Sequence, residues 1–447
     1  MTVTASVRTA RARSHRRTAL ALLAVLLAGA SSPAHADAVL DWNAVLLSAI
    51  RLARPPPPMA ARDMAIMNTA VYDAVNAASA LRYRPYRYDG PPVLGASAEA
   101  AASAAAYRVL SHLFPEIAAQ APSLAARMQA LYDHATGDAT APAVAIGVAL
   151  GDRQADAILA ARAHDGADAS PPPYLGDTAT GRWRPTPPGM APGTLPQWPQ
   201  VTPWAMTAPT QFRPPGPPPL TSTTWAGSLN MVEALGSAKS EVRGPERTEI
   251  ALFWADLDGT ETPPGHWLDI AISVAADRAL DLLQNARLLA LVSVAEADAG
   301  IVAWDAKYAY SAWRPITAIA EAESSGNAEV MAEPGWTPLL ATPPFPEYVS
   351  AHSTFSSAAA TALRLFFGDD RVAFTAHSDA EGLSGVTRHF ASFSSAAEEA
   401  GMSRIYGGIH FRFSHLDGNA AGRNLGQYVF DNFFQSAPGI AATVTTH

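Results

Sequence analysis

The stretch "PPFPEYVSAHSTFSSAAATALRLFF", residues 343–367, joins a Pro-punctuated loop to a helix of small and apolar residues. Ser350 and His352 lie where the loop enters the helix. The first backbone N–H groups of a helix have no partner within it, and they form the positive end of the helix dipole. Ser350 can therefore be a simple helix cap, or it can form part of an anion site together with His352.

The composition around this stretch indicates a large buried core. The chain has 447 residues, of which 49% are hydrophobic and 16% charged, and it contains 37 Pro and no Cys. The absence of Cys excludes disulfides, thiol catalysis and Cys-zinc sites. A formal net charge of −9 makes nucleic acid and anionic lipid poor partners.

Residues 1–36 have the pattern of a secretory signal peptide. Five Arg precede the apolar stretch "TALALLAVLLAGA", which is too short to span a bilayer comfortably, and Ala34-His35-Ala36 supplies a cleavage site. We therefore predict a secreted or periplasmic protein that begins at Asp37 and has no membrane anchor after cleavage. Because the segment carries five Arg and no acid, its removal would lower the net charge from −9 to about −14.

Apolar residues three and four apart predict helices through most of the mature chain. No run with a period of two predicts a strand, and no fixed-period repeat is present. We therefore predict an all-α protein made of one or two helical bundles. The predicted helical stretches are residues 58–81, 97–114, 141–165, 225–236, 245–256, 266–313, 352–367, 394–406 and 419–434.

Residues 165–222 differ from these stretches in composition. Their Pro-rich runs, such as "QFRPPGPPPLTS", exclude a helix or a central strand. Few charges and several Trp indicate an ordered loop over the core rather than a disordered linker. We therefore predict an N-terminal helical half at 37–164, this connecting segment, and a C-terminal helical half at 223–447.

The first of three polar stretches in the C-terminal half is "WDAKYAYSAWRP", which carries Lys307 and Arg314. Seven residues make two helical turns, so a helix would place both cations on nearly one face. Pro315 would end or bend that helix. Two cations buried on an otherwise aromatic face are costly unless an anion lies between them.

The second stretch is Ser350-Ala351-His352, and the third, "SRIYGGIHFRF", carries Arg404 and His410. The last two are six residues apart and out of phase on one helix, but Gly407-Gly408 lets the backbone turn so that both face one pocket. Together the three stretches supply cations, a hydroxyl, helix-start amides and two imidazoles. Such a set suits a cage for a tetrahedral oxyanion, with one His to attack or ligate and one to move protons.

These stretches resemble the signature shared by vanadium-dependent haloperoxidases and type 2 phosphatidic-acid-phosphatase-like acid phosphatases, which is Lys-x6-Arg-Pro, then Pro-Ser-Gly-His, then Ser-Arg-x5-His-x3-Asp. Residues 307–315 match the first part completely. Residues 349–352 depart from the second at its Pro and Gly, and residues 403–414 depart from the third at its Asp. Three stretches in order over about 110 residues make the match specific, and the upstream helices resemble the secreted bacterial branch.

The resemblance implies a fold of the chloroperoxidase and acid phosphatase type and a role for each residue. In the haloperoxidases the bound anion is vanadate, and phosphate can occupy the same site. His410 matches the ligand, which holds vanadate through one vanadium–nitrogen bond. His352 matches the acid–base residue that helps peroxide bind and break. The vanadate oxygens would be hydrogen-bonded by the remaining matches, which are Lys307, Arg314, Ser350, the Ala351 amide and Arg404.

Two aromatic residues extend the resemblance. Trp304 and Phe345 match the aromatic residues of the halide pocket in fungal chloroperoxidases. An apolar wall desolvates halide and makes its oxidation more feasible. The alternative interpretation is that both are ordinary core aromatics.

Two departures bear on the site itself. Ala351 keeps the N–H of the family's Gly, but its methyl group needs room. Ser414 removes a carboxylate expected to orient His410. Either Asp417 or His415 compensates, or the site is weakened; by its spacing alone, His415 is expected to be solvated.

Residues 256–260, "DLDGT", copy the first motif of haloacid-dehalogenase-type phosphatases. That motif must follow a buried parallel strand, whereas here it follows a helical pattern. The sequence therefore predicts a turn at this position.

The resemblance implies a secreted haloperoxidase that oxidises halide with hydrogen peroxide to a hypohalous species. The alternative is an acid phosphatase acting on a phosphate monoester, in which His410 forms a phosphohistidine and His352 protonates the leaving group. A third hypothesis is a non-catalytic descendant that binds an oxyanion.

Overall fold

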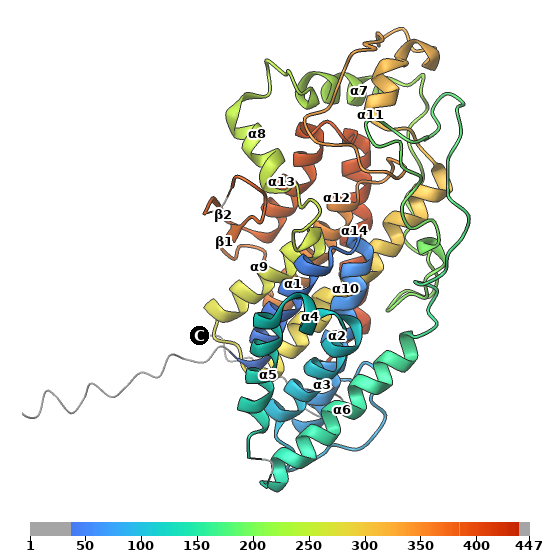
Figure 1. Cartoon of the computed structure of the whole chain (residues 1–447). Coiled ribbons are helices and arrows are strands. Elements are labelled where there is room, and N and C mark those ends of the chain that lie inside the picture. Colours follow the sequence, from blue (N-terminus) through green and yellow to red (C-terminus); the bar gives the residue numbers. More distant parts are fainter. Residues whose placement is uncertain (1–36, 139, 384, 438–447) are drawn as a thin grey trace, which may run out of the picture. The chain divides into compact units, whose positions relative to one another are not determined.

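Helices make up most of the computed structural model, which describes residues 37–138, 140–383 and 385–437 (Figure 1). The predicted signal peptide lies outside the described residues. The elements are α1 Ala38–Ala53, α2 Pro57–Ala78, α3 Ala98–Leu113, α4 Ile117–Gln120, α5 Pro122–Thr136, α6 Pro142–Arg162, η1 Trp198–Gln200, α7 Thr223–Gly236, α8 Gly244–Phe253, α9 Thr262–Asp277, α10 Leu282–Tyr310, α11 Pro315–Ala320, η2 Ala322–Ser325, α12 Ala351–Phe367, β1 Phe374–His377, β2 Thr387–Phe390, α13 Phe393–Tyr406 and α14 Arg412–Asn432. The predicted all-α class is confirmed. The one antiparallel hairpin in the described part of the chain, β1–β2, was not predicted, because strands of four residues are too short to display a period.

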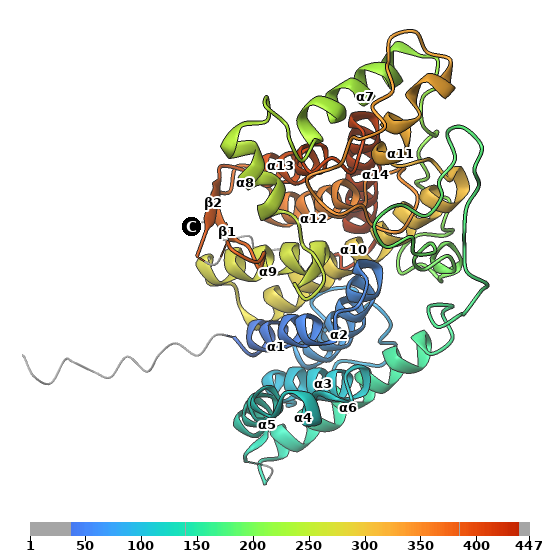
Figure 2. The ribbon, with the colours of Figure 1, turned by 45° about the horizontal axis from the view of Figure 1, so that its top comes forward.

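α10 lies at the centre of the helical layers. It is buried on all sides, so it shows no amphipathic stripe, and this is the pattern of a core helix. It packs against α2 on one side and against α12 on the other (Figure 2). Beyond α2 follow α3 and α6, and beyond α12 follow α13 and α14. This order places α12, whose first turn carries His352, between the core helix and the C-terminal helix pair.

α12 and α14 approach each other closely because α14 presents glycines to α12. A Cβ added at Gly422 would lie 2.3 Å from the backbone oxygen of Thr354, and one at Gly418 would lie 2.8 Å from that of Ser350. Neither position has room for a side chain. The start of α12 is therefore held against α14 by backbone-to-backbone packing.

The Pro-rich connecting segment is ordered, as predicted, and it packs onto the end of α10. The backbone N–H of Thr194 donates to the Pro344 carbonyl at 2.8 Å. The Thr194 carbonyl accepts hydrogen bonds from the Trp304 indole at 3.0 Å and the Tyr308 hydroxyl at 2.6 Å. The segment thus supports both the end of α10 and the loop that precedes α12.

Two expectations about the long helical stretch at 266–313 are wrong. The stretch is divided between α9 and α10, and α10 begins with a capping box formed by Asp281 and Gln284. α10 then ends at Tyr310, because Ser311 adopts the left-handed conformation with φ 49°. Lys307 and Arg314 therefore do not share a helix face, and Arg314 instead directly precedes α11.

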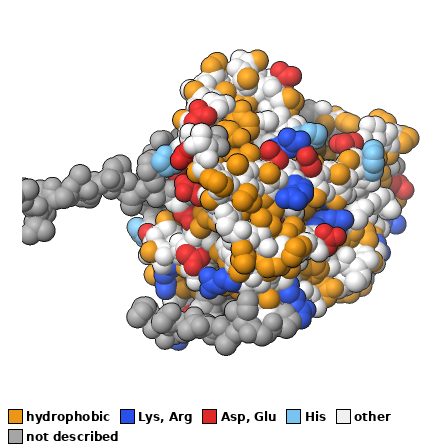
Figure 3. All heavy atoms as spheres, turned by 90° about the horizontal axis from the view of Figure 1, so that it is seen from below, with side chains coloured by type: hydrophobic (Ala, Val, Ile, Leu, Met, Phe, Trp, Pro, Cys, Tyr) orange, Lys and Arg blue, Asp and Glu red, His pale blue; other side chains and the backbone are white. Residues whose placement is uncertain are grey.

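The surface mixes side chains of different kinds. Figure 3 views the molecule from below, and on that face charged side chains of both signs are interspersed with hydrophobic ones. No helix within the described residues is long and apolar enough to cross a lipid bilayer.

Candidate oxyanion site

A cavity of about 190 Å³ lies where the loop before α12, the loop after α8 and the turn between α13 and α14 meet. The three stretches singled out in the sequence converge on it. The predicted residues that line it are Trp304, Phe345, Ala351, His352, Arg404 and His410. The other three, Lys307, Arg314 and Ser350, are completely buried behind it, and of these Arg314 is hydrogen-bonded to the lining residues Phe345, Ile409 and His410.

The hydrogen bonds of His410 define its tautomer. Its Nε2 lies 3.2 Å from Nη1 of Arg314, and a guanidinium can only donate. Nε2 is therefore the acceptor, so Nδ1 carries the proton and donates to a carboxylate oxygen of Glu347 at 2.7 Å. Burial and the nearby cations, Arg314 first among them, hold the pKa of His410 well below its usual value. The site thus presents a neutral imidazole with its lone pair directed toward the cations.

Glu347 is the functional residue that sequence reasoning missed. It is completely buried, and besides His410 it accepts the backbone N–H of Phe411 at 3.0 Å. It lies beside Ser414, the residue that replaces the carboxylate expected from the family pattern. The carboxylate partner of His410 is therefore supplied by the loop before α12 instead of by α14.

Neither of the two residues expected to compensate for Ser414 contacts His410. The carboxylate of Asp417 accepts the hydroxyl of Tyr348 at 2.8 Å. His415 is fully buried rather than solvated, because it points toward α12 and α13, where its Nδ1 lies 3.0 Å from the Ser353 hydroxyl. Glu347, and neither Asp417 nor His415, is therefore the hydrogen-bond partner of His410.

Lys307 and Arg314 are held by backbone carbonyls of the surrounding loops. The Lys307 ammonium donates to the carbonyls of Glu347 at 3.0 Å and Val349 at 2.5 Å. Arg314 donates to the carbonyls of Phe345 and Ile409, both at 2.8 Å. Burial, together with the neighbouring Arg314, lowers the pKa of Lys307 well below its usual value, and burial lowers that of Arg314 to about 10.

Arg404 and His410 reach the same cavity because the chain turns between α13 and α14. Gly408 has φ +80°, and a Cβ there would lie 2.4 Å from the Gly236 carbonyl oxygen, so only glycine fits. Arg404 is buried and donates to the Ala251 carbonyl at 3.1 Å. Burial lowers its pKa to about 10, although the charge of Asp256 opposes this effect.

The first turn of α12 supplies hydrogen-bond donors. Ser350 is the N-cap, and its hydroxyl oxygen accepts from the backbone N–H and the hydroxyl of Ser353, at 3.4 and 3.0 Å. This leaves the Ser350 hydroxyl proton free to donate elsewhere. Ala351 lines the cavity with an ordinary helical backbone, so its methyl group is accommodated. No hydrogen bond among the described residues uses the Ala351 N–H.

His352 has looser contacts than His410. Its Nε2 is buried without a hydrogen-bond partner in the part of the chain that the structure describes, and it lies 3.7 Å from a carboxylate oxygen of Asp256. The other oxygen of Asp256 lies 3.0 Å from Nδ1 of His266. Burial, followed by the positive charge of Arg404, lowers the pKa of His352 well below its usual value. His352 is therefore a neutral base with an unused nitrogen.

Asp256 belongs to the "DLDGT" stretch, which is a loop between α8 and α9, consistent with the predicted turn. What the sequence did not indicate is that its carboxylate lines the cavity. Burial alone would lower the pKa of His266, but the charge of Asp256 raises it to about 9. His266 is thus a cation that balances Asp256.

An aromatic wall borders the cations. The rings of Trp304 and Phe345 lie 5.0 Å apart. Lys307 Nζ and the Arg314 guanidinium carbon lie 5.1 and 4.8 Å from the centre of the Phe345 ring. Phe345 therefore separates the cationic groups from the apolar part of the cavity.

The charges at the cavity call for an anion. Nη2 of Arg314 is buried with no hydrogen-bond partner among the described residues, and the Nε2 lone pair of His410 lies on the same side as this guanidinium. Cations outnumber carboxylates, and a bound dianion would offset the excess. The positive groups are Arg314, Arg404 and His266, which Lys307 joins when a bound anion offsets its lowered pKa, and the carboxylates are Glu347 and Asp256. The donor set therefore fits a tetrahedral oxyanion such as vanadate or phosphate.

The fold and the site describe a helical protein with a buried, cation-lined cavity, and comparison with known proteins shows what the chain is similar to. Residues 287–438 match the family model described as the VCPO second helical-bundle domain. Vanadium chloroperoxidase of Curvularia inaequalis is 29% identical over 243 residues. That match covers 42% of this chain and 38% of the relative, so it spans less than half of the relative's length.

Solved structures extend the comparison over the described fold. The first bacterial vanadium-dependent iodoperoxidase superposes with a TM-score of 0.75 and 29% identity, covering 89% of this chain and 97% of its own. A holo bacterial vanadium-dependent chloroperoxidase, with a TM-score of 0.63 and 19% identity over 85% and 93%, shares the fold. The chain is therefore similar to vanadium haloperoxidases over its whole described fold, and residues 287–438 match the second helical-bundle domain of that family.

Proposed function

We propose that this chain is a vanadate-dependent haloperoxidase, which oxidises halide with hydrogen peroxide to a hypohalous species. The observation that carries the proposal is the arrangement of His410. Its Nδ1–H donates to Glu347, so that its Nε2 lone pair faces a cavity rich in cations. This is how a neutral imidazole ligand is prepared for a metal centre.

The residues of the cage divide the work of holding vanadate. His410 would be the one protein ligand, and Lys307, Arg314 and Arg404 would neutralise and hydrogen-bond the oxygens. The Ser350 hydroxyl and the Ala351 N–H add donors at the positive end of α12. Vanadate bound in this way would supply the electrophilic centre at which hydrogen peroxide is activated for oxygen transfer to halide.

His352 would move the proton. Its Nε2 is neutral and has no partner, so it can accept a proton from incoming peroxide and return it later. The carboxylate of Asp256, 3.7 Å away, would stabilise the imidazolium while it exists. Beside these groups the wall formed by Trp304 and Phe345 would strip water from the halide.

The test compares two activities of protein expressed without residues 1–36. Chloride, bromide and iodide oxidation is followed by halogenation of a phenol dye, with and without orthovanadate, and p-nitrophenyl phosphate hydrolysis is measured in parallel. We expect halide oxidation that depends on orthovanadate and on peroxide. Phosphate-ester hydrolysis without vanadate-dependent halogenation would assign the cage to a phosphatase instead. Oxyanion binding without either activity would point to a binding protein.

We also propose that the protein is exported and that its mature chain begins at Asp37. The motive is the order of basic, apolar and small-residue segments in residues 1–36. N-terminal sequencing of protein from the culture medium or periplasm should give Asp37 as the first residue. Exported material that still contains the basic segment would contradict this proposal.

A further inference from the structure

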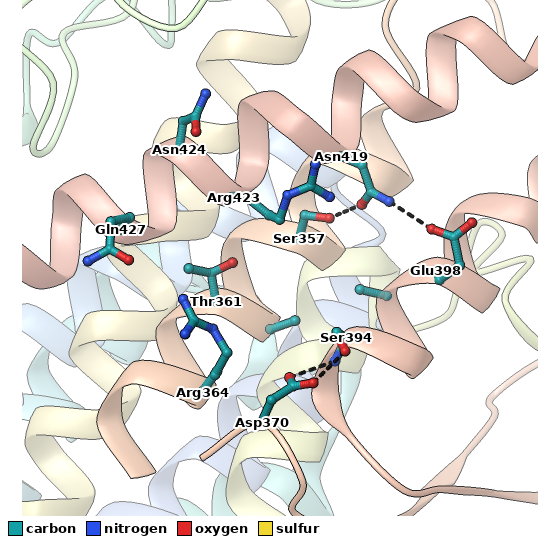
Figure 4. A pocket seen from close by; sticks show the side chains of 12 residues that line it. Ser357, Thr361, Arg364, Asp370, Ser394, Glu398, Asn419, Arg423, Asn424 and Gln427 are labelled. Atoms are coloured by element: carbon teal, nitrogen blue, oxygen red, sulfur yellow. Dashed lines mark hydrogen bonds between the residues drawn. The ribbon is translucent and has the colours of Figure 1, made fainter. Parts of the chain in front are cut away.

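A second hollow, the polar cleft, opens between α12, α13 and α14, with a volume of about 440 Å³ (Figure 4). Its carboxylates are engaged by neighbouring groups. Asp370 accepts the backbone N–H and the hydroxyl of Ser394. Glu398 accepts the amide of Asn419 at 3.0 Å, and Asn419 in turn accepts the hydroxyl of Ser357.

A chain of hydrogen bonds leads from Glu398 toward the oxyanion cage. A carboxylate oxygen of Glu398 lies 3.1 Å from Nε2 of His415. Nδ1 of His415 lies 3.0 Å from the Ser353 hydroxyl, which lies 3.0 Å from the hydroxyl of Ser350. The outer end is open to the cleft, since the Glu398 side chain is 55% exposed, whereas His415 is 0% exposed. The inner end, Ser350, is the N-cap residue of the cage.

Donor and acceptor rules allow this chain two proton arrangements. In the first, Ser353 donates to Nδ1 of His415 instead of to Ser350, and a neutral His415 donates from Nε2 to Glu398. In the second, Ser353 donates to Ser350, so Nδ1 of His415 must carry a proton. Because Nε2 must also donate to the Glu398 carboxylate, His415 is then an imidazolium.

Only in the second arrangement does Ser350 accept from the Ser353 hydroxyl, and a hydroxyl that accepts such a bond is a stronger donor to an anion in the cage. Going from the first to the second adds one proton, taken from solvent through the cleft, to Nδ1 of His415. The Ser353 hydroxyl rotates from Nδ1 of His415 to Ser350, and no other covalent bond is made or broken. A cage anion that accepts from Ser350 therefore favours the protonated form of His415.

We propose that Glu398, His415 and Ser353 form a proton relay between the polar cleft and the cage, and that the relay couples oxyanion binding to protonation of His415. This proposal rests on the proposed function only in assuming that the cage binds an oxyanion. The three residues are positioning residues, since they act through Ser350.

Packing and charge around the relay are consistent with this role. A Cβ added at Gly401 would lie 2.1 Å from Nδ1 of His415, so α13 leaves a space that the imidazole fills. The hydrogen bond from His415 lowers the pKa of Glu398, and Arg412 acts in the same direction. The remaining charged groups that face the pair across the polar cleft are Asp370, Arg364 and Arg423.

The test measures proton uptake when inorganic phosphate binds, which requires no halide oxidation. Titration calorimetry in buffers of different ionisation enthalpy gives the number of protons bound per phosphate. We expect Ser353→Ala and Glu398→Gln each to take up about one proton fewer than the parent. In the first, Ser350 is disconnected from His415; in the second, the Gln amide can donate to Nε2, so His415 stays neutral. The phosphate Kd of both variants should therefore vary less steeply with pH, by up to about tenfold per pH unit.

Asp431→Asn is the matched control, because it removes one carboxylate from α14 at an exposed position, where it accepts the side-chain amide of Gln427. It should take up as many protons as the parent. Variants that bind more weakly but keep the parental proton number and pH profile would overturn the relay and leave a packing role. If Ser353→Ala fails to fold, the partly exposed Glu398→Gln decides alone. A parent that binds neither phosphate nor orthovanadate would overturn the cage itself, which separates failure of the proposed function from failure of the relay.

Discussion

The two histidines of the cavity are held in opposite ways. His410 follows the turn after α13, and both of its nitrogens have partners, Glu347 at 2.7 Å and Arg314 at 3.2 Å. His352 lies in the first turn of α12, and its Nε2 has no partner, with Asp256 at 3.7 Å. His352 is 16% exposed and His410 3%, and the pKa of each lies well below its usual value, so both are neutral and charge does not distinguish them.

What distinguishes them is freedom to change protonation state. A proton on Nε2 of His410 would meet the Arg314 guanidinium, whereas a proton on Nε2 of His352 would meet the carboxylate of Asp256. The first position suits a fixed ligand and the second a proton carrier. If this contrast is correct, substitutions on the two sides should fail in different ways.

The largest effect is expected for His410→Ala. It removes the one protein ligand, so vanadate would be held only by hydrogen bonds and would be lost on dialysis. Vanadium content after dialysis should fall to background, and halide oxidation should disappear with it. His377→Ala, which changes an exposed histidine on β1, is the control and should retain both. A His410→Ala protein with parental rates would mean that the ligand is misassigned.

His352→Ala should have the next largest effect, and of a different kind. The cage around His410 stays intact, so vanadium should be retained, while turnover should fall by roughly 10²–10⁴-fold, as for loss of a general acid–base group. Vanadium content and halide oxidation rates are measured on the same dialysed samples. Equal loss of vanadium from both histidine variants would remove the distinction between anchor and carrier.

Glu347→Gln tests why His410 is the fixed member of the pair. Replacing the Glu347 carboxylate weakens the hydrogen bond that it accepts from Nδ1–H of His410. Changes to such partners of a metal ligand typically cost 10–100-fold in metal affinity. Vanadate affinity, measured by calorimetry, should therefore fall by about 10–100-fold. Asp417→Asn is the matched control, because its carboxylate contacts Tyr348 instead, and its affinity should stay parental. A larger loss of vanadate affinity in Asp417→Asn than in Glu347→Gln would instead make Asp417 the partner of His410.

The sequence predicted the helical class, and the structure places six of the nine predicted site residues in the lining of one cavity, because short motifs at fixed spacing are visible without a structure. The sequence did not predict Glu347, although this residue lies in the Pro-punctuated loop that leads into α12. Its partner His410 is 63 residues away, and only folding reveals such a pairing. In the same way His415 was expected to be solvated, because spacing along one helix says nothing about the helix that covers it. The prediction that Lys307 and Arg314 share one helix face is wrong for a local reason: Ser311 adopts the left-handed conformation and ends α10 between them.

The smallest effect is expected for substitutions of Ser414, which test the residue that supplies the carboxylate beside His410. The family pattern has a carboxylate at this position, and here Ser414 lies beside Glu347, which is buried and whose pKa burial raises to about 7. Ser414→Asp alone would therefore place two carboxylates side by side, and we expect vanadate affinity to fall by about tenfold, the effect of roughly 1.4 kcal/mol of like-charge repulsion.

In the Glu347→Gln background the same substitution should act in the opposite direction, because the introduced carboxylate would then be the only one near His410. We expect the double variant to regain about tenfold of the affinity lost in Glu347→Gln, so that the two substitutions are strongly non-additive. Calorimetry of the parent, both single variants and the double variant gives the coupling directly. Additive losses would show that the carboxylate cannot be moved between the two positions, and that Glu347 acts through the loop it belongs to instead of through its charge on His410.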